Sequence, residues 1–283
     1  MFKTRLLWLC HALLLTACAI PASKSDTPGA PQRIISIVPS VTEMLFAFGL
    51  EGKVIAVSDY DEFPPEVTTK QRIGALLNPN IEKIMELKPD LVITYGTQDV
   101  LRDRLQSVGI HFYPFVHGNV DHTLQFMLDL GRTVGTEVRA RQVVQDIRST
   151  FDEVRRNAPA ARPKVVLITY RGAGVLGAFY TVGSRAFQHD LIEMAGGRNL
   201  FADVEAETLQ PTLEEVISRK PDIIIETVPA RERAEVAQRK KDWATVGLAN
   251  GRVYIEADEY LMVPGPRFTL AARRLSEIIR GAR

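Results

Sequence analysis

The stretch NIEKIMELKPDLVITY (residues 80–95) recurs 132 residues later as TLEEVISRKPDIIIET (residues 212–227). Five of the sixteen aligned positions are identical, and four more exchange one aliphatic side chain for another. Each copy predicts a helix, a Lys-Pro-Asp turn and a buried strand. A second pair of strand-like runs, residues 33–38 and 164–169, is separated by 131 residues. Two matches at nearly one spacing indicate an internal duplication.

Strand-like and helix-like segments alternate around the first copy. Aliphatic and aromatic runs near residues 33–38, 53–57 and 111–116 are separated by segments of helical length. Ser40 and Glu43 have the spacing of a capping box at the start of the first helix. Strands that alternate with helices form parallel sheets covered by helices. The fold class predicted is therefore α/β, with two Rossmann-like lobes, each on a parallel sheet.

A long helix is predicted between the two lobes. Val144, Ile147, Phe151 and Val154 recur at intervals of three and four residues, the spacing of one apolar helix face. We expect one helix over residues 136–157, about 30 Å long, that joins the lobes stiffly and leaves a cleft of nearly fixed width. The expected division is an N-terminal lobe at 32–121, an interlobe helix region at 122–163 and a C-terminal lobe at 164–283.

The N-terminus has the features of an export signal. A basic start is followed by an apolar run of about ten residues (6–15), which is too short to cross a bilayer. The run ends in Leu-Thr-Ala-Cys, which resembles the bacterial lipobox and makes Cys18 the expected lipidation site. We expect a lipoprotein signal peptide at 1–17 and a flexible tether at 18–31, which places the protein in the periplasm or on the cell surface. An ordinary cleaved signal without acylation is the alternative.

Composition excludes several classes of protein. The 283 residues are 46% hydrophobic and 24% charged, as in soluble globular chains, and the formal net charge is +1. A chain so nearly neutral has no general attraction for nucleic acid. Both cysteines lie in the first twenty residues, so the folded part holds no disulfide or thiol chemistry.

Polar and aromatic side chains follow the predicted strands at their carboxyl ends, where open parallel sheets bind ligands. An aromatic ring with a polar tip suits a large planar ligand, although a single tyrosine there can equally be packing. Arg171 could clamp a carboxylate or phosphate, or form a salt bridge within the protein. The ligand-binding candidates from this rule are Tyr60, Tyr95, His117, Tyr170, Arg171 and Tyr260.

Neither a bare metal site nor a catalytic site is predicted. His111 and His117 lie at opposite ends of one predicted strand, about 20 Å apart, so they cannot share an ion. Ser184 lacks the second glycine of a nucleophile elbow, and no phosphate-binding glycine loop follows any strand. We expect no catalytic residues, no protein-bound metal and no intrinsic cofactor. The alternative of another class is a metal-dependent hydrolase.

Six segments in order resemble the helical-backbone (class III) substrate-binding proteins of bacterial ABC importers. Among these, the resemblance is greatest to vitamin B12 binders, with iron-siderophore and haem binders close behind. It covers essentially residues 32–281. The segments are the two repeat copies together with SDYDEFPPEV (58–67), AGGRNLFAD (195–203), WATVGLANGRVYIEAD (243–258) and PGPRF (264–268).

The resemblance implies roles for particular residues. Glu82 and Glu214, at matching positions of the two repeat copies, correspond to the family's permease-docking carboxylates. Each also lies in the first turn of a predicted helix, where the dipole favours a carboxylate. Leu76 lies at the ligand site, where the vitamin B12 binder has a tryptophan against the corrin ring, and this departure bears on specificity.

The resemblance also implies a function and partners. We expect a monomeric transport protein that captures cobalamin, a corrinoid, in the interlobe cleft and delivers it to an ABC permease dimer driven by a cytoplasmic ATPase. Contact with the membrane is expected only through the lipid anchor. A ferric siderophore or haem is the alternative ligand.

Overall fold

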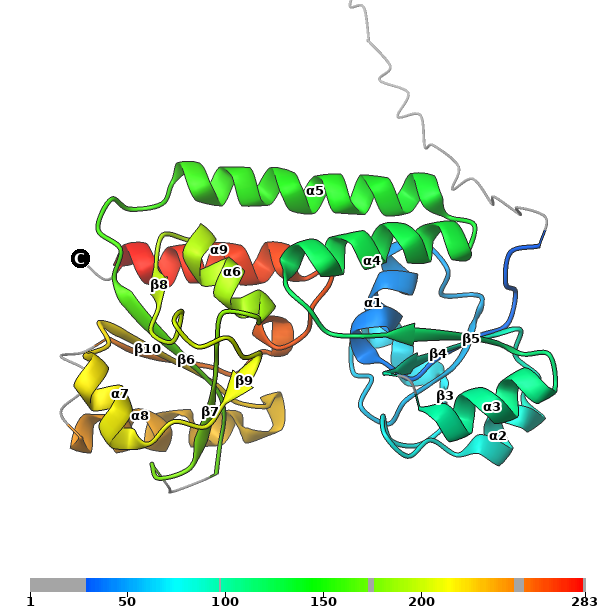
Figure 1. Ribbon diagram of the computed structural model, residues 1–283, viewed down its shortest axis with the longest axis horizontal. Helices are drawn as coiled ribbons and strands as arrows, with labels where there is room; N and C mark the ends of the chain where they lie inside the picture. The colour runs from blue at the N-terminus through cyan, green and yellow to red at the C-terminus, as the bar shows by residue number, and fades with distance from the viewer. Residues whose placement is uncertain (1–28, 97, 173–175, 247–251, 282–283) are drawn as a thin grey trace, which may run out of the picture.

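The structure is a computed structural model that describes residues 29–96, 98–172, 176–246 and 252–281. Figure 1 shows two α/β lobes side by side, with a long helix across both. The N-terminal lobe holds a five-stranded parallel sheet in the order β3-β2-β1-β4-β5. Its elements are β1 (Ile34–Ser36), α1 (Pro39–Ala47), β2 (Val54–Val57), η1 (Pro65–Thr69), β3 (Gln71–Arg72), α2 (Ile81–Glu86), β4 (Leu91–Tyr95), α3 (Asp99–Ser107) and β5 (His111–Phe115).

The C-terminal lobe is built on a second sheet, in the order β11-β10-β6-β7-β9, with β8 paired to β6. Its strands are β6 (Lys164–Arg171), β7 (Phe179–Val182), β8 (Arg198–Asn199), β9 (Thr208–Leu209), β10 (Ile223–Thr227) and β11 (Val253–Glu256). Its helices are α6 (Phe187–Met194), α7 (Leu213–Arg219), η2 (Ala230–Glu235), α8 (Val236–Thr245), η3 (Glu259–Leu261) and α9 (Phe268–Gly281). One strand, β7, runs antiparallel to β6, and the interval between the end of β6 and the start of β7 is shorter than the dozen or more residues that a parallel crossover needs.

The internal duplication is visible in the register of the two sheets. Ile34 faces Leu91 where β1 pairs with β4, and Val165 faces Ile223 where β6 pairs with β10. These pairs are the positions that the sequence repeat aligns. Helices α2 and α7 are capped in the same way. The side-chain oxygen of the N-cap residue, Asn80 or Thr212, accepts the backbone N–H three residues later in the chain.

The Lys-Pro-Asp turn does the same work in both lobes. Lys88 and Lys220 have φ of 46° and 55°, a left-handed conformation that ends each helix before the proline. The aspartate then accepts the backbone N–H at the start of the adjacent strand: Asp90 from Arg33 at 2.9 Å and Asp222 from Lys164 at 2.7 Å. The turn therefore ties each helix-strand unit to the first strand of its lobe.

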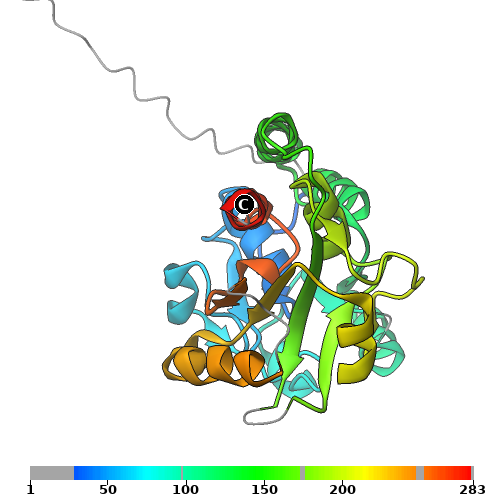
Figure 2. The same cartoon turned by 90° about the vertical axis from the view of Figure 1, so that its left-hand side faces the viewer.

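The connection between the lobes consists of two helices, α4 (Val120–Thr133) and α5 (Glu137–Arg156). The long helix expected at residues 136–157 is confirmed as α5, which lies along both lobes in Figure 1. Figure 2 looks down α5 and α9, which run side by side. The Phe268 ring of α9 packs 6.2 Å from Phe151 on α5 and 5.3 Å from Phe187 on α6.

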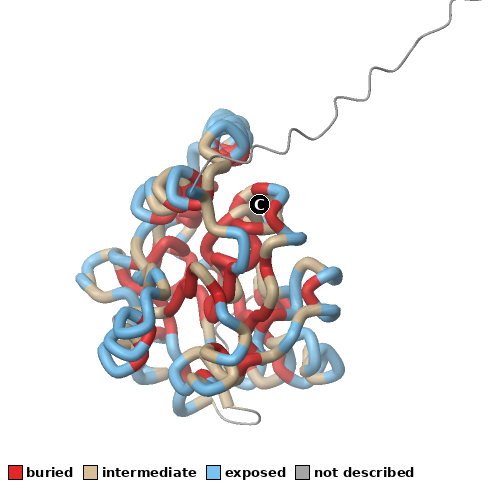
Figure 3. Tube along the Cα trace, turned by 90° about the vertical axis from the view of Figure 1, so that its right-hand side faces the viewer, coloured by how far each residue is buried: buried red, intermediate tan, exposed pale blue. Residues whose placement is uncertain are grey.

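Burial follows this layering. Figure 3 shows the buried residues concentrated in the interior of the molecule, with the exposed residues around its outside. The strands β1, β4 and β10 are buried along nearly their whole length, as expected for parallel strands covered on both sides.

The capping box predicted for the first helix is wrong. The helix begins at Pro39, two residues early, and its N-cap Val38 makes no side-chain bond. Because Pro39 has no N–H to satisfy, it suits the first helical position. Ser40 and Glu43 are both buried, and Glu43 instead binds Arg267.

Candidate functional site

The two sheets present the carboxyl ends of their strands toward each other. In Figure 1 the strands β4 and β5 point from the N-terminal lobe toward the C-terminal lobe. Nδ1 of His117, two residues beyond β5, lies 3.0 Å from Oε1 of Glu207, which directly precedes β9. This contact joins the lobes across the space between them. The edge that the sequence predicted as the ligand site therefore lies between the lobes.

Large apolar side chains stay exposed at this edge. Tyr60 beyond β2 and Tyr170 in β6 each keep 61% of their surface exposed. Four more large apolar side chains near these strand ends are exposed: Phe63, Leu77, Val116 and Tyr180. They were not selected from the sequence. Burying one such side chain is favourable by about 1.5–3 kcal/mol, so a group of exposed ones marks a surface where a bound ligand or partner would be stabilised. We call these six residues the apolar rim.

His117, Tyr95 and Leu76 lie together on the N-terminal side. The Tyr95 and His117 rings meet edge to face, with centroids 5.0 Å apart. Gln98 donates from Nε2 to the carbonyl oxygens of Leu76, at 2.9 Å, and of Tyr95, at 3.0 Å, which fixes both backbones. Leu76 and Tyr95 are half-buried. Burial, and then the nearby Glu207 carboxylate, raise the pKa of Tyr95 and keep its phenol neutral.

A pocket of about 210 Å³ lies at the same edge of the C-terminal lobe. We call it the edge pocket. It is formed where β6 and β10 end and where η2 and η3 begin. Its lining includes Thr169, Tyr170, Thr227, Glu259, Met262 and Val263. Of these, sequence reasoning named Tyr170 and pointed to the segment around residue 259, without choosing Glu259.

Arg171 also lines this pocket, where it forms internal ion pairs. Its side chain is 0% exposed, and it donates to both carboxylate oxygens of Glu226, at 3.0 and 3.1 Å, and to Asp242 at 3.0 Å. The salt-bridge alternative is therefore present in the structure, and ligand contact by Arg171 stays a prediction. The physical reason is that Glu226, itself fully buried on β10, needs compensating charge.

Tyr260 is anchored by its hydroxyl group. Its hydroxyl donates to Glu256 at 3.0 Å, and the same carboxylate binds Arg274 on α9. Burial raises the pKa of Tyr260, and the Glu256 carboxylate raises it further. The ring packs against the main core rather than lining the edge pocket. The hydroxyl of Tyr260 is therefore engaged within the protein, and contact of Tyr260 with a ligand stays a prediction.

Glu82 and Glu214 occupy the first turns of α2 and α7. Both are exposed, and neither carboxylate has a hydrogen bond or ion pair with any residue that the structure describes. Figure 1 places α2 and α7 in different lobes, both on the side of the molecule away from α5. The two carboxylates are thus free for a partner that contacts both lobes.

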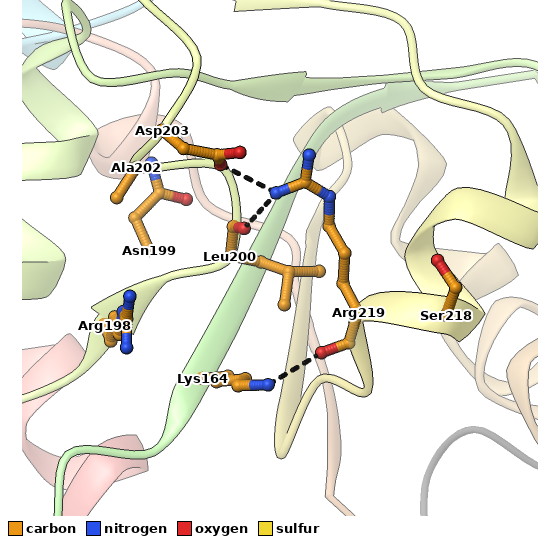
Figure 4. A pocket seen from close by; sticks show the side chains of 8 residues that line it. All are labelled: Lys164, Arg198, Asn199, Leu200, Ala202, Asp203, Ser218 and Arg219. Carbon is orange, nitrogen blue, oxygen red and sulfur yellow. Dashed lines mark hydrogen bonds and ion pairs between the residues drawn. The ribbon is translucent and has the colours of Figure 1, made fainter.

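A second pocket lies on the far side of the C-terminal lobe, near the start of β6 (Figure 4). Arg219 there pairs with Asp203 at 2.7 Å, and Nζ of Lys164 donates to the carbonyl oxygen of Arg219 at 3.0 Å. Because this pocket lies at the amino ends of the strands, it is separate from the interlobe edge.

The predicted lipidation site Cys18, the signal peptide and most of the tether lie outside the described residues. Within the described part of the chain, every helix is too short or too polar to span a membrane. The same residues contain no group of three or more His, Cys, Asp or Glu side chains placed to hold a metal ion.

The periplasmic binding protein family model matches residues 34–258. This chain belongs to the periplasmic binding protein family. It is 28% identical over 218 residues to the vitamin B12-binding protein of Yersinia pestis (strain Pestoides F), an alignment that covers 75% of this chain and 73% of that relative.

Solved structures of periplasmic binding proteins share the fold. The vitamin B12 binding protein BtuF of Vibrio cholerae superposes with a TM-score of 0.72 at 24% identity, covering 89% of this chain and 98% of that one. The heme binding protein HutB of Vibrio cholerae gives a TM-score of 0.77 at 17% identity, covering 88% and 98%. At these identities the likeness establishes the two-lobed architecture alone.

Proposed function

We propose that this protein is a lipid-anchored, extracytoplasmic binding protein of an ABC importer that captures cobalamin between its lobes and delivers it to the permease. The observation that carries the proposal is the apolar rim at the facing strand ends. A large macrocycle would cover these side chains, and burial of apolar surface is worth about 25 cal/mol per Å². Tyr60, Tyr95 and Tyr170 would add hydrogen bonds from their hydroxyl groups.

The relatives support cobalamin as the first choice of ligand. The Yersinia pestis relative named above is a vitamin B12-binding protein aligned over three quarters of this chain. The lobes need no chemistry of their own for this task, because binding and release suffice.

Haem or a ferric siderophore is the second candidate, favoured by a specific contact. The imidazole of His117 and the phenol of Tyr95 lie next to each other at the edge, and both groups are used as iron ligands by haem proteins. Leu76 also stands where an aromatic side chain would be expected against a corrin ring.

The test is a calorimetric titration of the full chain, purified in detergent, with cobalamin, a ferric hydroxamate, a ferric catecholate and haem. We expect cobalamin to bind with micromolar or tighter affinity. Binding of haem or a siderophore without cobalamin would replace cobalamin by that ligand. Absence of binding by all four would refute the proposal.

Delivery is tested by reversing the two free carboxylates, Glu82→Arg with Glu214→Arg. Because two-fold symmetric permeases offer the same contact to each lobe, the double variant should bind ligand normally but lose uptake in cells. The matched control is Glu137→Arg, which reverses a glutamate in the first turn of α5, on the opposite side of the molecule. Normal uptake by the double variant would refute docking through these residues.

A further inference from the structure

Most charged side chains around the edge pocket form ion pairs within the protein. Arg171 forms ion pairs with Glu226 and Asp242. Arg239 donates to Glu226 at 2.7 Å, to Glu232 at 2.8 Å and to Glu235. Four carboxylates thus surround the two buried guanidinium groups that line the pocket, which leaves an excess of negative charge around it.

Three further arginines of the interlobe edge are committed as well, whereas Arg231 in η2 is 75% exposed and lies 3.8 Å from Glu232. Arg233 pairs with Asp258 at 3.1 Å, and Arg267 donates twice to Glu43 while lying over the Phe63 ring. Arg72 donates to two backbone carbonyl oxygens at 2.7 Å each. None of these three guanidinium groups is left to bind a carboxylate of a ligand.

Glu259, by contrast, lines the pocket without a hydrogen bond or ion pair from its side chain to any described residue. Burial, and then the carboxylate of Glu62, raise its pKa. The charges of Arg267 and Arg231 act in the opposite direction. A ligand that enters the edge pocket therefore meets an unpaired carboxylate.

We propose that the edge pocket receives hydrogen-bond donors of the ligand, such as amide or ammonium groups, and selects chelates without net negative charge, with Glu259 as the discriminating residue. This inference rests on the proposed function of chelate binding. Anions are bound in proteins by arginine, lysine or backbone N–H groups, and the two arginines that line this pocket, Arg171 and Arg239, are occupied by protein carboxylates. A carboxylate brought beside Glu259 in this partly buried site would instead be repelled.

The proposal orders the candidate ligands by charge. The corrin ring of cobalamin carries primary amides, and a ferric trishydroxamate is uncharged or carries a free ammonium group, so both fit the pocket. Haem carries two propionates and a ferric tris-catecholate is a trianion, so both are disfavoured. We expect the wild-type protein to bind a favoured chelate at least about tenfold more tightly than either anionic one.

The deciding variant is Glu259→Gln, which keeps the size and one oxygen of the side chain. It should raise the affinity for haem and for the tris-catecholate about tenfold and change the affinity for cobalamin by less than about threefold. The control is Glu51→Gln, an exposed glutamate at the amino end of β2, which should change none of the affinities. Calorimetry of each full chain at pH 7.5 and low salt provides the measurement.

Equal affinity of the wild-type protein for anionic and uncharged chelates would overturn the inference while leaving chelate binding intact. An unchanged anionic affinity in Glu259→Gln would overturn it too. If no chelate binds at all, the proposed function falls and this inference falls with it. Circular dichroism at each titration condition confirms that the variant is folded.

Discussion

We expect the substitution Glu226→Ala to cost the C-terminal lobe about 4 kcal/mol of unfolding free energy. The Glu226 carboxylate is fully buried and accepts four hydrogen bonds. Two come from Arg171, one from Arg239 and one, at 2.6 Å, from the indole N–H of Trp243. Alanine removes the acceptor for all four at once.

The magnitude follows from what each donor keeps. Removing one partner of a buried ion pair costs about 3–5 kcal/mol. Arg171 retains Asp242, and Arg239 retains Glu232 and Glu235, so the ion-pair loss falls at the lower end of that range. Trp243 is left with a buried, unsatisfied N–H, which adds at least about 1 kcal/mol.

The assay is urea unfolding followed by far-ultraviolet circular dichroism, with the free energy taken from linear extrapolation. The control is Glu277→Ala, which removes the ion pair between Glu277 and Arg274. The two charged groups lie 3.1 Å apart, and the Glu277 side chain is 58% exposed. That exposed pair should be worth less than about 1 kcal/mol. If Glu226→Ala costs no more than the control, the reasoning about the buried network is refuted.

Three further predictions concern other contacts. Asp90→Ala and Asp222→Ala should each lower the free energy of urea unfolding by about 1–2 kcal/mol, because each removes a carboxylate that accepts the backbone N–H at the start of a strand. If only one of the two variants is destabilised, the two turns are not equivalent. Burial raises the pKa of Glu43 to about 7, against the opposing Arg267 contact, so the folded state holds this proton more tightly than the unfolded state. As the pH rises from about 4.5 to 7, the free energy of unfolding should therefore fall by about 3 kcal/mol in the wild type but not in Glu43→Gln. If the difference in unfolding free energy between the two proteins does not change with pH, the Arg267 ion pair outweighs burial. His117→Ala should change stability by less than about 1 kcal/mol, since the contact with Glu207 is exposed to solvent, and a larger loss would mean that the lobes depend on this contact.

Local chemistry is what made the fold predictable. The repeat around Lys88-Pro89-Asp90 specifies its own turn, because proline excludes the helical conformation before it and the aspartate reaches the neighbouring backbone. The helix-strand order then follows, and so does the parallel pairing of β1 with β4 and of β6 with β10. The antiparallel direction of β7 was not predicted, because a short connection has no periodic sequence pattern.

The site was predicted less completely, since its decisive contacts join distant residues. Arg171 meets Glu226 and Asp242 across 55 and 71 residues, and Glu43 meets Arg267 across 224. No spacing rule distinguishes such a committed arginine from one that awaits a ligand. Exposed apolar residues such as Leu77 were missed because the same side chains are usually buried.

The indole of Trp243 gives the molecule a reporter of its own. The sequence holds two tryptophans, Trp8 and Trp243, and cleavage of the signal segment would remove the first. Trp243 is fully buried in the second core of the C-terminal lobe, next to the Phe179 ring. Its fluorescence should stay blue-shifted and shielded from acrylamide for as long as that lobe is intact, regardless of the state of the N-terminal lobe. Emission and circular dichroism recorded on the same sample can therefore time the melting of one lobe against that of the whole chain.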